Sequence, residues 1–224
     1  MKGQLFKKYR HFSFALVFLA IHLVFFWLEL TVEAKYYMDR NIDTHIPFIK
    51  YFVVAYCFWH LYVFAVPIYF GLKSKRDFFE LCSFMALGTA ICMVIYFLFP
   101  NGQRLRPEIV ETDIFSRLIA FIYSIDTPTN VAPSMHVLDA IAIHIALVRY
   151  EPFARRKLLP PISFIVMVLV SLSTMFIKQH ALLDVLFSIL LCALLYPLVY
   201  ILLPKLIYRK EEGEIKNQLV TEEN

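Results

Sequence analysis

The chain has 224 residues, of which 60% are hydrophobic, 17% aromatic and 18% charged, and its formal net charge is +4. Soluble domains are typically about 45–50% apolar and about 25% charged, so this composition is typical of a membrane protein. No stretch combines a dense basic patch with exposed aromatic residues, which argues against nucleic acid as a partner.

Six apolar runs are long enough to cross a bilayer, whose core needs about 20 mostly apolar residues per helix. The first run lacks a small-residue cleavage site after it and is predicted to be a retained helix rather than a signal peptide. The predicted spans are residues 12–32, 51–70, 78–99, 133–149, 158–178 and 181–204. The sequence therefore predicts an all-α polytopic membrane protein, with one six-helix domain over residues 1–210 and a charged cytoplasmic tail over 211–224.

The distribution of Lys and Arg between the loops predicts the orientation, because cytoplasmic loops carry an excess of both. Fifteen fall on one side of the six-span arrangement: Lys2, Lys7, Lys8, Arg10, Lys73, Lys75, Arg76, Arg149, Arg155, Arg156, Lys157, Lys205, Arg209, Lys210 and Lys216. Seven fall on the other: Lys35, Arg40, Lys50, Arg104, Arg106, Arg117 and Lys178. We expect a multi-pass protein of the cell membrane with both termini in the cytoplasm.

Catalytic chemistry is predicted at the extracytoplasmic ends of the helices. His180 and Asp184 are four residues apart, so on a helix they share one face. Asp184 can then hold one ring nitrogen of His180 and leave the other as a nucleophile toward phosphorus. A polar helix cap is the alternative interpretation of this pair. His136 lies in the first turn of the fourth span, where it can act as a general acid for a leaving alkoxide.

Phosphate-binding groups are predicted beside these residues. Arg106 supplies a planar fork suited to phosphate oxygens. Ser134 offers a hydroxyl and a backbone N–H at a helix N-terminus, where anions bind favourably. Arg104 and Lys178 are candidates for further cations from their positions in the chain.

A metal site is the alternative chemistry. Its candidate ligands are His136 with Asp139 and His144, or His136 with His180 and Asp184. Neither set has the tight four-ligand spacing of a structural metal site. The four cysteines lie in apolar runs without metal or disulfide spacing.

These clusters resemble the motifs of the type 2 phosphatidic acid phosphatase (PAP2) superfamily. The first family motif ends in Arg-Pro, as Arg106-Pro107 does. The second is Pro-Ser-Gly-His, which Pro133-Ser134-Met135-His136 matches except for its glycine. The third runs from Ser-Arg through five residues to His and three more to Asp, and here covers residues 173–184. The resemblance extends over roughly residues 50–200 and implies a PAP2-like helical bundle.

The resemblance implies metal-independent catalysis without a cofactor, through a phosphohistidine. His180 would attack phosphorus, Asp184 would orient it, and His136 would protonate the leaving group. Two family cations are absent, because the lysine of the first motif falls at Phe99 and the arginine of the third at Thr174. Arg104 or Lys178 would then have to replace them.

The sequence thus predicts an integral membrane phosphatase acting on a lipid phosphate monoester or diphosphate, such as phosphatidic acid, phosphatidylglycerophosphate or an isoprenyl diphosphate. Two alternatives stay open. One is a transferase of phospho-head groups, as in inositol phosphorylceramide synthases. The other is a non-enzymatic membrane protein with a vestigial site. The sequence predicts no particular lipid and no oligomeric state.

Overall fold

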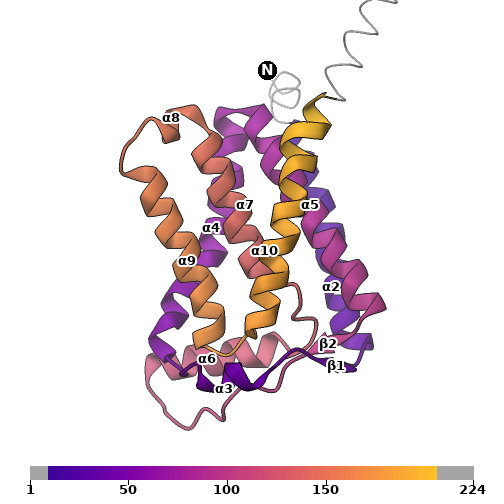
Figure 1. The fold of residues 1–224 in the computed structure, drawn as a ribbon, viewed down its shortest axis with the longest axis vertical. Helices are drawn as coiled ribbons and strands as arrows, with labels where there is room; N and C mark the ends of the chain where they lie inside the picture. The colour runs from indigo at the N-terminus through magenta and orange to yellow at the C-terminus, as the bar shows by residue number, and fades with distance from the viewer. Residues whose placement is uncertain (1–9, 206–224) are drawn as a thin grey trace, which may run out of the picture.

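The computed structural model describes residues 10–205, and six helices form its bundle (Figure 1). They are α2 (Ala15–Thr31, preceded by the 3-10 turn Arg10–Phe14), α4 (Val53–Lys73), α5 (Lys75–Leu98), α7 (Met135–Arg149), α9 (Leu159–Phe176) and α10 (Leu182–Pro197, continued by a π-helical turn at Leu198–Leu202). The shorter elements are β1 (Tyr36–Tyr37), α3 (Asn41–His45), the 3-10 turn Lys50–Phe52, β2 (Asn101–Gly102), α6 (Ile114–Ile125) and α8 (Glu151–Ala154).

All six predicted spans correspond to helices, and the chain is an all-α membrane protein. Within the described residues, five helical segments are long and apolar enough to cross a membrane: Arg10–Thr31, Lys50–Lys73, Lys75–Leu98, Leu159–Phe176 and Leu182–Lys205. The sixth, α7, has 15 residues. At 1.5 Å per residue it is shorter than the roughly 30 Å hydrocarbon core. The predicted tail at 211–224 lies outside the described residues.

Helix α7 packs against α4, α5, α9 and α10. Leu138, Ala142 and Ile143 on α7 are fully buried. Gly88 of α5 allows a close approach, because a Cβ there would lie 2.6 Å from Leu138 Cδ1. Because lipid tails are as apolar as leucine, the hydrophobic effect does not drive helices together within a membrane. Close van der Waals packing of this kind holds them together instead.

The polar loops gather at one end of the bundle, where Figure 1 shows α3, α6, β1 and β2, whereas α8 lies at the opposite end. Strands β1 and β2 pair in parallel, and Gly102 also bridges to Thr129. A Cβ on Gly102 would lie 2.8 Å from both Ala34 Cβ and the Pro128 carbonyl oxygen, so only glycine fits between these segments. The loops that precede α3 and α7 are thereby held side by side.

The unpredicted helix α6 crosses this polar end. Asp113 caps it by accepting hydrogen bonds from the backbone N–H groups of Phe115 and Ser116. Its buried residues Ile119 and Ile122 face the bundle. The 100–132 segment, which lies between two predicted spans, therefore contains an amphipathic helix, and the chain leaves that helix at Asp126.

Candidate functional site

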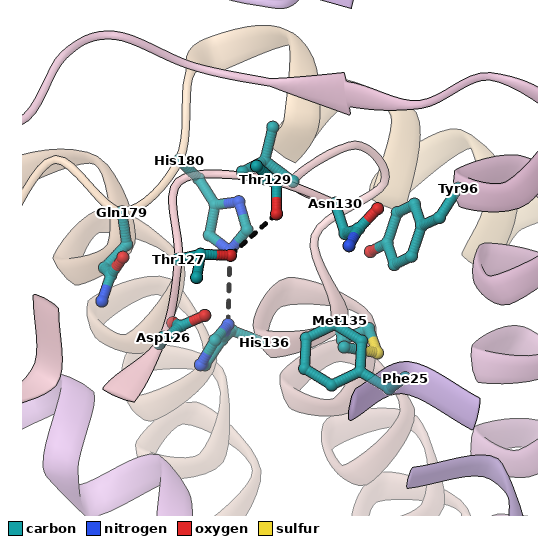
Figure 2. Close-up of a pocket in the computed structure, with 11 residues that line it drawn as sticks. Phe25, Tyr96, Asp126, Thr127, Thr129, Asn130, Met135, His136, Gln179 and His180 are labelled. Carbon is teal, nitrogen blue, oxygen red and sulfur yellow. Dashed lines mark hydrogen bonds between the residues drawn. The ribbon is translucent and has the colours of Figure 1, made fainter. Parts of the chain in front are cut away.

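His136, His180 and Asp184 form a hydrogen-bonded chain at the polar end of the bundle. His180 Nδ1 lies 3.3 Å from Asp184 Oδ2. His180 Nε2 lies 3.3 Å from His136 Nδ1, a contact drawn in Figure 2. His180 is 7% exposed and Asp184 is fully buried. The three residues predicted to be catalytic are therefore brought together, with the carboxylate on one imidazole nitrogen and the second histidine on the other.

The local fold around His180 differs from the predicted one. His180 lies in the turn before α10 rather than on the helix, and Asp184 is in the first turn of that helix. The Asp184 carboxylate accepts a 2.8 Å hydrogen bond from the Ala181 backbone N–H, which satisfies a donor at the helix start. The backbone N–H groups of Gln179 and His180 both donate to the Thr174 carbonyl oxygen. The same carboxylate therefore caps α10 and holds the imidazole.

His136 is held in the first turn of α7, as predicted. Ser134 is the N-cap of this helix, and its Oγ accepts from the Val137 backbone N–H at 3.4 Å. The rings of Tyr56 and Trp59 on α4 pack against the imidazole of His136, with centroid distances of 4.7 and 4.3 Å. These contacts leave the His136 ring directed at His180.

A small, partly open cavity of about 20 Å³ adjoins the two histidines (Figure 2). Its lining residues come from α2, α5, the 126–131 loop, the start of α7 and the turn before α10: Phe25, Tyr96, Asp126, Thr127, Thr129, Asn130, Val131, Met135, His136, Gln179 and His180. The volume is about that of one water molecule. Met135, which stands where the family motif has glycine, occupies part of the wall, and a phosphoryl group would have to displace lining side chains.

Arg106 stands behind the cavity wall rather than in it. Its guanidinium donates to the Asp126 carbonyl oxygen at 2.7 Å and to the side-chain oxygen of Gln179. It also stacks on the Tyr123 ring at 4.5 Å. Burial lowers the pKa of Arg106, and the Asp126 charge opposes that shift. The Nε atom is buried and has no hydrogen-bond partner among the described residues.

Ser134, Arg104 and Lys178 do not line the cavity. Ser134 is fully buried, with its backbone N–H bonded to the Asp184 carbonyl oxygen. The guanidinium of Arg104 is exposed, stacks on Tyr37 at 4.1 Å and lies 3.4 Å from Asp39. Ser134 is engaged in capping α7 and Arg104 in surface contacts, and the assignment of these two residues to phosphate binding gains no support from the geometry.

Lys178 has a structural role in this arrangement. Its Nζ donates to the backbone carbonyl oxygens of Asp43 and Ile46, at 2.9 and 2.5 Å. Asp43 in turn accepts a 2.7 Å hydrogen bond from the Leu182 backbone N–H at the start of α10. The 41–46 segment is therefore held against the turn that carries His180, and the Lys178 ammonium group is engaged with this segment.

Replacing Lys178 by methionine should lower thermal stability and leave the turnover of the folded protein close to wild type. The variant keeps the aliphatic stem but leaves two buried carbonyl oxygens without their charged donor, at a cost of about 1.5–3 kcal/mol. Melting of the purified variant, with kcat/KM measured on the folded fraction, checks this. A large drop in kcat/KM at unchanged stability would restore Lys178 to the phosphate site.

Three residues with carboxyl or amide side chains line the cavity without having been indicated by the motifs: Asp126, Asn130 and Gln179. Burial raises the pKa of the Asp126 carboxyl, and the nearby Arg106 guanidinium opposes that shift. The adjacency of Gln179 to His180 was the one signal in the sequence that could have found any of them. Asp126 and Asn130 lie in a loop whose path depends on α6 and on the β1–β2 pairing.

The metal alternative finds no ligand set in the part of the chain that is described. Among residues 10–205, no group of three His, Cys, Asp or Glu side chains is placed to hold a metal ion. His144, a member of one proposed set, lies with its Nδ1 3.0 Å from Ser163 Oγ on α9. The imidazole therefore bridges two helices.

Comparison with known proteins agrees with the motif resemblance. No curated protein and no solved structure matches the chain significantly. A sequence model of the PAP2 superfamily matches residues 78–208, which is more than half of the chain and includes all three motif segments. The chain therefore belongs to the PAP2 superfamily, which indicates phosphoryl-transfer chemistry of the phosphatase type in a membrane protein.

Proposed function

We propose that the protein hydrolyses the phosphate ester of a lipid through a phosphohistidine on His180. The observation that carries this proposal is the hydrogen-bonded chain from Asp184 through His180 to His136. It is supported by a bundle of apolar helices, which brings the site to lipids rather than to soluble phosphates. A lipid phosphate monoester and a lipid diphosphate are the candidate substrates.

The geometry supports a two-step displacement. With its Nδ1 proton directed at Asp184, His180 presents the Nε2 lone pair to phosphorus. The N–P bond forms, the bond from phosphorus to the leaving oxygen breaks, and His136 gives that oxygen a proton. A water molecule then loses a proton to His136 and attacks phosphorus. The N–P bond breaks, which releases phosphate and restores both histidines.

Turnover should persist in excess chelator and be inhibited by vanadate. Histidine and fixed hydrogen-bond donors need no divalent ion, and vanadate mimics the five-coordinate phosphorus of the transition state. Release of inorganic phosphate from phosphatidic acid and from an isoprenyl diphosphate by the purified protein is the measurement. Loss of turnover in chelator, restored by one added metal ion, would refute the metal-free route and favour a metal site at the histidines.

Transfer of a phospho-head group to a lipid alcohol is the second candidate. It keeps the same histidine chemistry and replaces water by an alcohol in the second step. It is favoured by the absence of a cation at residues 99 and 174, which are Phe and Thr. New phospholipid formed without released phosphate would support it, whereas no turnover of any lipid phosphate would support the non-enzymatic alternative.

We further propose that the site faces the outside of the cell membrane. The charge count predicts this orientation, and α10, whose first turn carries Asp184, begins at the end of the bundle where Figure 1 shows α3 and α6. Six of the cytoplasmic cations in that count lie outside the described residues: Lys2, Lys7, Lys8, Arg209, Lys210 and Lys216. The lipid in the outer leaflet would then be the substrate.

Intact cells should process an added membrane-impermeant lipid phosphate analogue with a short acyl chain. Opening the cells should increase the rate little, because the site is already exposed to the added analogue. Cells that express the His180→Ala variant give the background rate. Turnover that begins only after the membrane is opened would place the site in the cytoplasm and reverse the topology.

A further inference from the structure

Four apolar side chains follow one another at helical spacing along α6: Ile114, Leu118, Phe121 and Ile125. Steps of three or four residues place side chains on one face of a helix, so these four form a stripe, called here the α6 stripe. Ile114 is 74% exposed, and Phe121 and Ile125 are both 58% exposed. Single exposed apolar residues are ordinary, whereas a contiguous exposed patch indicates a surface that meets lipid or another protein.

The α6 stripe adjoins the face that holds this helix against the bundle. Ile119 and Ile122 of α6 are buried in one cluster with Val53 and Tyr56 of α4. Leu118 is partly buried and packs against the same cluster. The apolar side of α6 is therefore wider than the part of it that the bundle covers.

The α6 stripe continues a surface that faces lipid. Helix α6 lies across the ends of the long helices rather than along them (Figure 1). The ring of Phe115 in its first turn meets the ring of Tyr51 edge-on, at a centroid distance of 5.2 Å. Tyr51 is 61% exposed and lines an apolar groove between α4 and α9 with Val54 and Phe58. That groove lies on the membrane-spanning segment Lys50–Lys73, so α6 begins where the lipid-facing surface of α4 ends.

An arginine borders the α6 stripe. Arg117 lies one helical turn before Phe121 and is exposed, and its guanidinium has no hydrogen-bond or ion-pair partner among residues 10–205. The carboxylates nearest to it along the chain, those of Glu111 and Asp113, are both paired with Lys50. The charge of Arg117 is therefore available to anionic groups outside the protein. A basic residue beside an apolar face is typical of helices that lie at a membrane surface.

We propose that α6 lies in the plane of the membrane surface, in the leaflet at the polar end of the bundle. The α6 stripe rests in the apolar boundary of that leaflet, and Arg117 reaches the lipid phosphates. Lipid is favoured over a second copy of the chain as the partner, because the stripe continues the lipid-facing surface of α4 and has a cation at its edge.

The other side of α6 is connected to the histidine site. The Tyr123 hydroxyl donates to the Ile177 carbonyl oxygen at 2.6 Å, three residues before His180. The Arg106 guanidinium donates to the carbonyl oxygen of Asp126, where α6 ends. A helix held at the membrane surface therefore fixes the depth of the histidines relative to the lipid phosphates. This placement does not depend on what the histidines react with, so it and the proposed function can fail separately.

The test locates α6 in liposomes that contain the full-length protein. A fluorophore is attached to a new cysteine in Phe121→Cys, on the stripe, or in Ala120→Cys, an exposed position about 100° around the helix. Cys57 is partly buried and the other native cysteines are buried, and the wild type treated in the same way gives the background. We expect a lipid-borne nitroxide to quench the label at 121 at least about twofold more strongly than at 120, and a water-borne quencher to show the reverse order.

Arg117→Gln, combined with Phe121→Cys, tests the contribution of the charge. A larger share of phosphatidylglycerol in phosphatidylcholine liposomes should increase the lipid-borne quenching at 121, and Arg117→Gln should remove that increase, because the attraction to anionic lipid is lost. Arg104→Gln is the matched control. Arg104 is also exposed at the polar end, but its guanidinium lies 3.4 Å from Asp39, so this variant should keep the increase.

Equal lipid-borne quenching at 120 and 121, or stronger water-borne quenching at 121, would overturn the placement of α6 in the leaflet. Protection of the label at 121 from both quenchers, with a disulfide between two chains when Phe121→Cys is oxidised, would assign the stripe to a second copy instead. A dependence on phosphatidylglycerol that survives Arg117→Gln would overturn the contact of Arg117 with lipid phosphates. All substituted side chains are exposed, so melting close to wild type is expected and reports that the fold is kept.

Discussion

Replacing His180 by alanine should abolish turnover of the lipid substrate, with a loss of at least about a thousandfold in kcat. The imidazole is the group placed to bond to phosphorus, and a loss of that size corresponds to about 4 kcal/mol of transition-state stabilisation. Asp184 keeps its hydrogen bond to the Ala181 backbone N–H in the variant, so α10 should still be capped. Turnover and thermal melting of the purified variant are the measurements.

A matched control is His22→Ala, which removes an exposed histidine whose Nδ1 bonds to the Phe18 carbonyl oxygen on α2. This variant should retain wild-type turnover. His136→Ala should accumulate a phosphoprotein when the substrate has a good leaving group, because attack continues while breakdown slows. Near wild-type turnover in His180→Ala, or a phosphoprotein that still forms in it, would assign the nucleophile to another residue.

Asp184→Asn should lower kcat by about a hundredfold while leaving the histidine geometry in place. The asparagine oxygen can take over the hydrogen bonds that Asp184 Oδ2 accepts from His180 and Ala181. What is lost is the negative charge that stabilises positive charge developing on His180, and single preorganised electrostatic groups of this kind contribute about a hundredfold to a thousandfold. The measurement is kcat/KM against the lipid substrate, with melting to report folding.

The matched control for this variant is Asp139→Asn. Asp139 is a buried aspartate on α7 that does not line the cavity. Both changes replace one buried aspartate by asparagine, and only the Asp184 change should affect turnover strongly. Equal losses in the two variants would indicate that Asp184 acts only through the stability of the bundle.

The helical architecture could be predicted from the sequence because span length and apolarity are local properties of the chain. Each predicted span corresponds to a helix, with ends shifted by a few residues, and within residues 10–205 five segments are long enough to cross a membrane. Helix α7 is the informative exception. Its 15 residues include three polar side chains, those of His136, Asp139 and His144. Polar side chains are tolerated in α7 because other helices cover it and it carries the site rather than facing lipid along its whole length.

The pairing of His180 with Asp184 could also be predicted, although for a reason that the structure replaces. The expected cause was a shared helix face, whereas His180 lies before α10 and Asp184 reaches back to it from the first helical turn. A four-residue spacing across a helix N-terminus gives the same contact because the capping carboxylate points toward the preceding turn. The meeting of His136 with this pair rests on the packing of α7 beside α10.

A membrane-embedded helical bundle, its PAP2 motifs and the three residues of the histidine–aspartate chain could be predicted from the sequence, since all of these depend on local composition and spacing. Which polar groups face the cavity depends on how distant loops pack together. Lys178 and Arg104 were near the site in sequence, yet their charges are taken up by Asp43, Ile46 and Asp39 from a distant loop. Asp126, Asn130 and Gln179 line the cavity instead, because a side chain's partners depend on long-range loop packing that spacing along one chain does not encode.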